Sequence, residues 1–384
     1  MTYLEKRAHF KTGLNERING CVFQKSKNGC KVASDILEEK RALQEALAAF
    51  LGTFKIDLMI VENALSIPMQ LPLGFALIDV ISRSGIPTIA HHHDFLWERS
   101  RFHLNGYRNI VHKAFPPRLP SVRHVVINSL AQEELKKRKG ISSRLIPNVM
   151  DFSNPPKINR KRVIQLREAI GVGADDIMVL QPTRLVARKG VGAALDIITG
   201  LNNPRCKLIV SHSVDDEGLD YYQWITATCK KRGIDIRFIH DRVADPITNR
   251  FDRDEKFSLW EVYAAADLVT YPSSWEGFGN GLLEAFYLKK PIVLNRYKIF
   301  VTDIEPKGFD VITFDDRITA ETIERIRRLL SDETRRKQMV ETNFKAAGRH
   351  FSYDLLKAQL SRLLPRQGRP DMRILRVPGD PSDG

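Results

Sequence analysis

Short apolar runs rich in β-branched residues alternate along the chain with stretches whose apolar positions recur at helical spacing. This alternation predicts an α/β fold in which helices connect the strands of parallel sheets. A polar, Pro-containing segment at 148–161 separates four expected strands from six. The expected strands are Asp57–Val61, Pro87–Ala90, Arg123–Ile127 and Arg144–Ile146 before it, and Ile177–Gln181, Lys207–Ser211, Asp235–Ile239, Asp267–Tyr271, Pro291–Leu294 and Asp310–Phe314 after it.

The length of 384 residues favours two domains, since one domain takes about 150 residues. We expect domains at 1–150 and 151–365, followed by a mobile tail at 366–384 that is rich in Gly, Pro and Asp. The apolar runs are strand-sized, far below the ~20 residues needed to span a bilayer, and the first residues lack an apolar signal-peptide core. Four scattered cysteines without a CxxC pair favour reduced thiols. These patterns predict a cytoplasmic protein.

Lys and Arg outnumber Asp and Glu by 60 to 46, which gives a net charge of +14. Such an excess suits nucleic acid, an anionic membrane surface or small anionic substrates. The basic runs lie on or beside expected helices, where a solvated face explains them, and no nucleic-acid signature accompanies them. We therefore expect no nucleic-acid partner, whereas weak association with an anionic membrane stays open. Nothing in these patterns indicates an oligomeric state.

Two acidic residues flank a glycine-rich loop that follows the expected strand Asp267–Tyr271. Glu276 begins the loop Glu276–Gly281, and Glu284 lies one turn into the helical stretch that follows. Ligands of open α/β sheets bind at the carboxyl ends of strands, where glycines allow close approach of the backbone. Ionised carboxylates accept hydrogen bonds from vicinal hydroxyls. Taken singly, Glu276 could instead be a charge favoured at a helix N-terminus, and Glu284 a solvated helix residue.

A second cluster follows the expected strand Ile177–Gln181. Arg184 and Lys189 lie in the loop before the next helix, and a glycine follows Lys189 directly. Two cations and a glycine at the carboxyl end of a strand suit a diphosphate, because Arg binds phosphate in a bidentate manner and Lys acts as a point charge. The alternative is a pair of surface cations.

Polar residues also follow two strands of the first half. His91, His92, His93 and Asp94 come after Pro87–Ala90, and Glu62 with Asn63 comes after Asp57–Val61. Three adjacent histidines could indicate zinc. However, consecutive side chains point in different directions, and no Cys or HxxxH completes a closed site, so we expect no metal. The alternatives are a capped, solvated helix start for the histidine segment and loop packing for Glu62 and Asn63.

The second half resembles the glycosyltransferase family 4 group of retaining glycosyltransferases. Glu276 and Glu284 match its E-x7-E motif, Arg184 and Lys189 match its R-x4-K-G pair, and Ile146–Phe152 matches the segment that closes the first domain. The resemblance covers roughly residues 55–365 and implies a GT-B fold, in which two Rossmann-like domains face a cleft. It also implies a nucleotide-diphosphate sugar as donor, a small hydroxyl acceptor, and neither cofactor nor metal.

The resemblance further implies roles for individual residues. Arg184 and Lys189 would hold the diphosphate and stabilise the leaving group, and Glu284 would take the ribose hydroxyls. Glu276 and the loop backbone would hold the donor sugar, and His93 would touch the transferred sugar or acceptor. A phosphate oxygen of the donor would take the acceptor's proton. The remaining expected contacts are Gly277, Phe278, Gly279 and Asn280 on the donor side, and Glu62, Asn63, Asp94 and Arg99 on the acceptor side.

Two features refine this expectation. The segments ENALSIPM and HHHDFLWER look like those of a subgroup that makes glycosylated glycerate-type solutes. In contrast, residues 1–30 show no strand and Gly-rich loop of the kind with which family members begin, so the first domain is expected to lack its first βα unit or units. The alternatives to an active transferase are therefore a truncated, non-catalytic remnant that binds sugar nucleotide and a basic nucleic-acid-binding protein.

Overall fold

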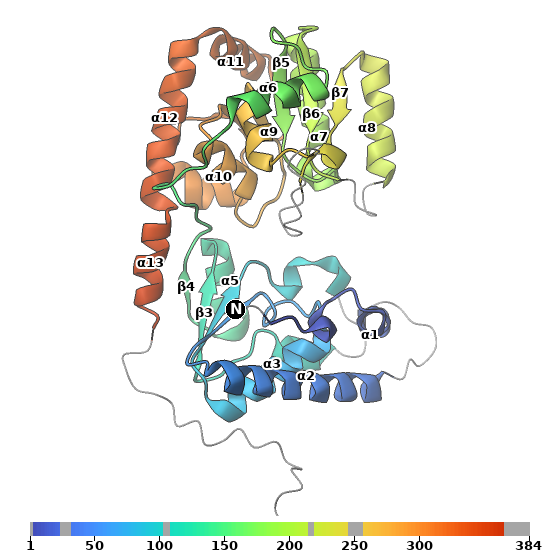
Figure 1. The fold of residues 1–384 in the computed structure, drawn as a ribbon, viewed down its shortest axis with the longest axis vertical. Helices are drawn as coiled ribbons and strands as arrows, with labels where there is room; N and C mark the ends of the chain where they lie inside the picture. The colour runs from blue at the N-terminus through green and yellow to red at the C-terminus, as the bar shows by residue number, and fades with distance from the viewer. Residues whose placement is uncertain (1–2, 24–31, 103–107, 214–218, 245–255, 365–384) are drawn as a thin grey trace, which may run out of the picture. The chain divides into compact units, whose positions relative to one another are not determined.

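The computed structural model describes residues 3–23, 32–102, 108–213, 219–244 and 256–364 (Figure 1). The chain divides into two compact units. Unit 1 comprises 1–147 together with 359–384, and unit 2 comprises 148–358. The tail expected at 366–384 lies outside the described residues.

Unit 1 is built on a four-stranded parallel sheet of order β1-β2-β3-β4. The strands are β1 (Met59–Glu62), β2 (Thr88–His92), β3 (Val122–Val126) and β4 (Ser143–Leu145). Its helices are α1 (Gly13–Phe23), α2 (Ala33–Phe54), α3 (Leu71–Ser84), α4 (Arg108–Ala114) and α5 (Ser129–Lys139). Leu51 of α2 packs with Leu77 and Ile81 of α3 in the core. Within 3–23 the chain forms a 3₁₀ turn at Lys6–Ala8 and α1, and no strand.

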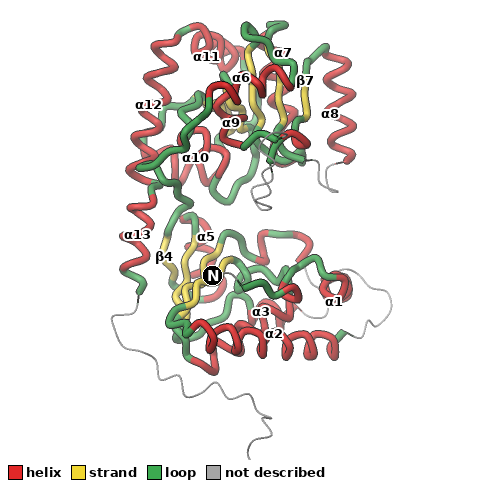
Figure 2. The backbone as a smooth tube through the Cα atoms, viewed as in Figure 1, coloured by secondary structure: helices red, strands yellow, loops and turns green. Residues whose placement is uncertain are grey.

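Unit 2 is built on a six-stranded parallel sheet of order β10-β9-β8-β5-β6-β7. Figure 2 draws strands in yellow and helices in red. The strands are β5 (Ile177–Gln181), β6 (Cys206–Val210), β7 (Ile236–Phe238), β8 (Leu268–Tyr271), β9 (Ile292–Asn295) and β10 (Ile312–Phe314). The helices are α6 (Arg160–Ala169), α7 (Val191–Leu201), α8 (Leu219–Arg232), α9 (Leu259–Ala265), α10 (Asn280–Tyr287), α11 (Ala320–Ser331) and α12 (Glu333–His350). Helix α13 (Tyr353–Ser361) begins in unit 2 and ends in unit 1. In the part of the chain that the structure describes, no helix has the length and apolar character to cross a membrane.

The direction in which successive strands are added across the unit 2 sheet changes once, although all strands are parallel. The chain runs from β5 outward to β7, returns to place β8 on the other side of β5, and then runs outward to β10. Ligands of open α/β sheets bind at the carboxyl ends of strands where the order reverses in this way. In unit 2 this position lies between β5 and β8.

One expectation about the cysteines is wrong. Cys21 is disulfide-bonded rather than reduced. No CxxC spacing in the sequence indicates this disulfide. Cys206 and Cys229 are free, as expected, and both are buried.

Candidate active site

The loops after β5 and β8 meet at the reversal point of the unit 2 sheet. Gly190 ends the first loop with a φ of 67°, and a Cβ atom at this position would lie 2.1 Å from the carbonyl oxygen of Pro272. Any other residue would therefore push the loops apart. The backbone N–H of Ser274 donates to the carbonyl oxygen of Arg188 over 2.9 Å. These contacts hold the β5 loop against the β8 loop.

Lys189 and Glu276 form a buried ion pair between the two loops. The Lys189 Nζ lies 2.5 Å from Glu276 Oε1, and Glu276 is only 8% exposed. Burial lowers the pKa of Lys189, and the positive charges of Arg188 and Arg184 lower it further, whereas Glu276 opposes the shift. Arg184 is exposed and close enough to act on Lys189 through its charge. A phosphate group here would meet two cations and compete with Glu276 for Lys189.

Glu284 is held by a neutral partner. It lies in the second turn of α10, and its Oε2 accepts a hydrogen bond of 2.7 Å from the hydroxyl of Tyr263. The same hydroxyl lies 3.1 Å from the carbonyl oxygen of Gly281. Burial raises the pKa of Glu284, and the bond from Tyr263 opposes that shift. Because Tyr263 is fully buried, it fixes where the carboxylate of Glu284 points.

A second tyrosine, Tyr297, holds the glycine loop between Glu276 and Glu284 in place. Gly279 has a φ of 117°, and a Cβ there would lie 2.2 Å from the hydroxyl of Tyr297. That hydroxyl donates to the carbonyl oxygen of Phe278 over 2.8 Å. At the start of α10, Asn280 Oδ1 accepts a hydrogen bond from Asn148 Nδ2 over 2.5 Å. The loop, with Gly277 between Glu276 and Phe278, is therefore held by Lys189 at Glu276, by Tyr297 at Phe278 and by Asn148 at Asn280.

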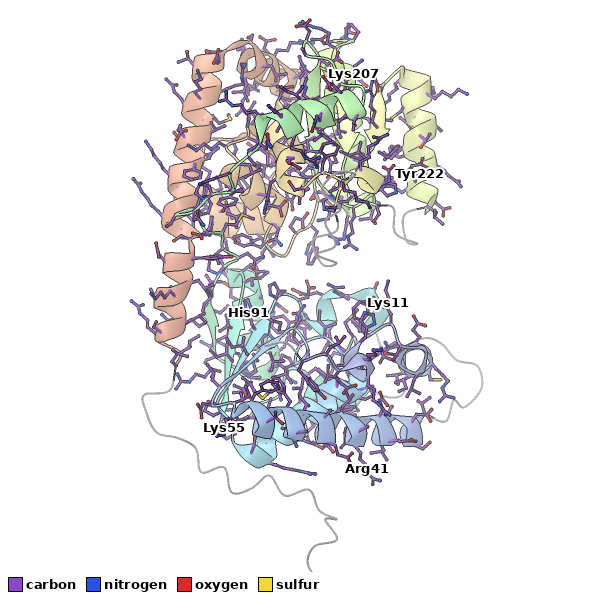
Figure 3. All side chains as sticks on the ribbon, in the orientation of Figure 1. Lys11, Arg41, Lys55, His91, Lys207 and Tyr222 are labelled. Atoms are coloured by element: carbon purple, nitrogen blue, oxygen red, sulfur yellow. The ribbon has the colours of Figure 1, made fainter. Side chains whose placement is uncertain are left out.

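In unit 1, Glu62 at the end of β1 joins two histidines of the next strand. His91 Nδ1 donates to Glu62 Oε2 over 2.8 Å, and His93 Nε2 lies 3.1 Å from the same oxygen. The hydrogen bonds from the two histidines lower the pKa of Glu62 to about 2, and the bond from His91 has the larger effect. His92 points the other way, and its buried ring lies 2.8 Å (Nε2 to Nδ1) from His124. Consecutive histidines thus point in different directions, as expected, but His91 and His93, two residues apart, share a face. His91 is labelled in Figure 3.

The other expected acceptor residues surround this cluster. Asn63 has a φ of 61°, and its Oδ1 accepts the backbone N–H groups of His93 over 2.8 Å and Asp94 over 3.3 Å. Asp94 forms an ion pair with Arg99. The structure therefore brings Glu62, Asn63, His93, Asp94 and Arg99 together at the carboxyl end of β1 and β2.

Comparison with known proteins decides the family. Residues 249–346 match the family model described as glycosyl transferases group 1. The chain is 35% identical over 367 residues to mannosylglucosylglycerate synthase of Thermotoga maritima, a match that covers 85% of this chain and 80% of that relative. The chain belongs to the group 1 glycosyltransferases. The resemblance seen in the sequence is thereby confirmed, and this group 1 glycosyltransferase transfers a sugar from a nucleotide sugar.

Two further proteins are similar to most of this glycosyltransferase chain. Mannosylglucosylglycerate synthase of Petrotoga mobilis is 34% identical over 282 residues, which cover 68% of this chain and 64% of that relative. The crystal structure of Anabaena HepE in complex with UDP and glucose has a TM-score of 0.64 and 17% identity, and covers 85% of this chain and 80% of that one. The expected α/β fold with two parallel sheets is confirmed and matches GT-B glycosyltransferase structures.

Several residues that shape the sites of this glycosyltransferase were not found in the sequence. Tyr263 lies in a mostly apolar stretch and Tyr297 lies between Arg296 and Lys298, so neither is marked as a site residue by the sequence. Both side chains are buried. The sequence predicts His93, and not His91, as a site residue. Strand alternation could have indicated His91, because residues two apart on a strand share a face.

Proposed function

We propose that this group 1 glycosyltransferase is a retaining hexosyltransferase that moves a hexosyl group from a nucleotide-diphosphate sugar to a hydroxyl acceptor. The observation that carries the proposal is the pairing of Lys189 with Glu276 at the reversal point of the unit 2 sheet. The charge of Arg184 acts on the same lysine, and Glu284 follows on α10. Two cations that can bind a diphosphate thus lie on the loop after β5, and two carboxylates that can bind hydroxyl groups lie on the loop after β8 and on α10.

Each group then has a task in the transfer. Arg184 and Lys189 hold the diphosphate and stabilise the negative charge that develops on the leaving nucleoside diphosphate. Glu284 accepts hydrogen bonds from the ribose hydroxyls. Glu276, together with the backbone of 277–280, binds the donor sugar. The acceptor attacks from the face of the leaving group, and a phosphate oxygen takes its proton, so no carboxylate pair has to flank the bond as in glycosidases.

Donor binding on these terms is independent of metal. The charge of the diphosphate is balanced by Arg184 and Lys189. We therefore expect EDTA to leave the affinity for a nucleotide sugar unchanged in isothermal titration calorimetry. A loss of donor affinity that added Mg²⁺ restores would contradict this part of the proposal.

The acceptor side is assigned to unit 1. His93, Asp94, Glu62, Asn63 and Arg99 supply imidazole, carboxylate, amide and guanidinium groups that can bind hydroxyl and carboxylate oxygens. The names of the two relatives support a glycerate-type acceptor and a mannosyl or glucosyl donor.

A transfer assay separates this function from a remnant that only binds donor. The purified chain would be incubated with GDP- or UDP-activated mannose or glucose and with glycerate or a glycosylated glycerate. We expect release of nucleoside diphosphate and a product that keeps the anomeric configuration of the donor, as read by NMR. Tight donor binding without turnover on any acceptor would favour the non-catalytic remnant instead.

A further inference from the structure

Glu62, His91 and His93 place three metal-binding groups on one face of the unit 1 sheet. His91 and His93 are two residues apart, so they point to the same side, and Glu62 is the direct neighbour of His91 in the pairing of β1 with β2. The two ring centroids lie 4.5 Å apart. One ligand atom from each of the three residues falls within 4.8 Å of the others. This spacing is compact enough for a single ion to contact all three.

The two imidazoles already converge on one point. His91 Nδ1 and His93 Nε2 both approach the same oxygen of Glu62, at 2.8 and 3.1 Å. The backbone behind them is fixed, because Asn63 Oδ1 accepts the N–H of His93. His92 anchors the strand from the opposite face through its bond to His124. An ion could therefore bind with small side-chain rotations and without movement of the strand.

The ligand set favours some ions over others. Two imidazoles and one carboxylate suit Zn²⁺, Co²⁺, Ni²⁺ or Fe²⁺, whereas Mg²⁺ and Ca²⁺ prefer sites made of oxygen ligands. The side chains of Glu62 and His93 remain 58% and 37% exposed. Three protein ligands at an exposed position leave coordination places open to oxygen atoms from solution, as in catalytic rather than structural sites.

We propose that Glu62, His91 and His93 bind a divalent first-row transition ion, and that this ion takes up the carboxylate and neighbouring hydroxyl of a glycerate-type acceptor. An α-hydroxycarboxylate offers two oxygen atoms that can occupy adjacent open positions on one ion. This inference rests on the proposed transferase function for its substrate, but not for the ion itself. It is separate from donor binding, which unit 2 carries out with Arg184 and Lys189 and without metal.

Metal binding is tested on the full chain without a histidine tag. After dialysis against EDTA and its removal, the protein would be titrated with Co²⁺ and Zn²⁺. We expect one ion per chain, and d–d absorption bands of bound Co²⁺ that report nitrogen and oxygen ligands. His91→Ala, His93→Ala and Glu62→Gln should each weaken binding by roughly tenfold or more. His9→Ala, which removes an exposed histidine of the same unit, should bind the ion as the wild type does.

Binding that persists unchanged in all three ligand variants would mean an adventitious ion only and would overturn the site, as would a wild-type chain that binds no ion. The acceptor part has its own readout. Addition of glycerate to the Co²⁺-loaded chain should change the absorption bands, whereas an unchanged spectrum would overturn the assignment of the ion to the acceptor. Nucleotide-sugar affinity of His91→Ala should equal that of the wild type. Failure of the metal site therefore differs from failure of the transferase function, which would appear as a wild-type chain that turns over no nucleotide sugar, whether or not it binds an ion.

Discussion

At the scale of single residues, the two acidic side chains of the donor loop differ in what holds them. Glu276 faces the ammonium group of Lys189, whereas Glu284 faces the neutral hydroxyl of Tyr263. Burial without a cationic partner raises the pKa of Glu284. Glu284 should therefore lose its ability to accept hydrogen bonds from a ribose at a higher pH than an ordinary glutamate would.

The raised pKa predicts a pH dependence of donor binding. Only the ionised carboxylate of Glu284 accepts from both ribose hydroxyls, so affinity should fall as pH falls through its raised pKa. The loss should begin above pH 4.5, the ordinary value for a glutamate. Isothermal titration with a nucleotide sugar at a series of pH values measures this. In Glu284→Gln this step should be absent, and a profile identical to that of the wild type would contradict the role of Glu284.

Replacement of Tyr263 by Phe removes the hydroxyl that orients Glu284. The loss of one buried hydrogen bond costs about 1 kcal/mol, which corresponds to roughly a fivefold weaker donor affinity. Tyr287→Phe is the matched control, because the Tyr287 hydroxyl lies within hydrogen-bond distance of the carbonyl oxygens of Asp151 and Asn154, away from Glu284. Both variants should lose stability in denaturant unfolding, but only Tyr263→Phe should raise KM for the donor. An equal effect on KM would reduce Tyr263 to a structural residue.

At the scale of elements, the site depends on how closely the loops after β5 and β8 approach. Their approach follows from the pairing of β5 with β8 and from the lack of a side chain at Gly190. The backbone of Pro272 occupies the space that a Cβ would need. The contact between Lys189 and Glu276 therefore depends on Gly190 as well as on the pairing of the strands.

Gly190→Ala should separate the loops and weaken both stability and donor binding. The overlap with Pro272 adds a cost of about 1–3 kcal/mol to the ~1–2 kcal/mol for a left-handed alanine. Gly233→Ala is the control, because Gly233 has a φ of 64° and nothing lies within 4 Å of its added Cβ. Chemical denaturation of both variants measures the loss of stability, and donor titration measures the loss of donor affinity. If Gly190→Ala bound donor as well as Gly233→Ala does, the loop contact would not be needed.

The elements themselves follow closely from the sequence, whereas their contacts do not. All ten expected strands form, with ends within two residues of those observed, because β-branched runs bounded by polar residues specify strands locally. The order that sets β8 beside β5 depends on packing between segments far apart in the chain, and no local pattern encodes it. For the same reason the motif residues Arg184, Lys189, Glu276 and Glu284 were predicted, but the ion pair of Lys189 with Glu276 was not. The grouping of Glu62 with His91 likewise appears only once β1 pairs with β2.

At the scale of the whole molecule, each unit has hydrophobic clusters of its own. Clusters around Ile81 and Phe115 stabilise unit 1, and a cluster that contains Leu208, Val293 and Ile326 stabilises unit 2. The net charge of +14 is a property of the entire chain. It promotes association with anions of many kinds, and so by itself it does not identify a substrate.

A pair of arginine variants can distinguish an effect of the net charge from specific binding of the donor. Arg184→Ala and Arg205→Ala each lower the net charge by one, and both arginines are exposed, but only Arg184 acts on Lys189. We expect about tenfold weaker donor binding for Arg184→Ala alone, since it removes a charged phosphate contact. Any retention on DNA should fall steeply with salt and be equal for the two variants. Wild-type donor affinity in Arg184→Ala, together with strong DNA retention, would favour a nucleic-acid-binding protein.

The central claim is that the acidic pair around the glycine loop binds an activated sugar. The most direct measurement is the donor Kd, by calorimetry, and the turnover of Glu284→Ala and Glu276→Ala, with Glu321→Ala at the exposed start of α11 as control. We predict that Glu284→Ala weakens donor binding by about tenfold or more and Glu276→Ala lowers kcat, while Glu321→Ala behaves as the wild type. Wild-type affinity and turnover in both loop variants would contradict the account.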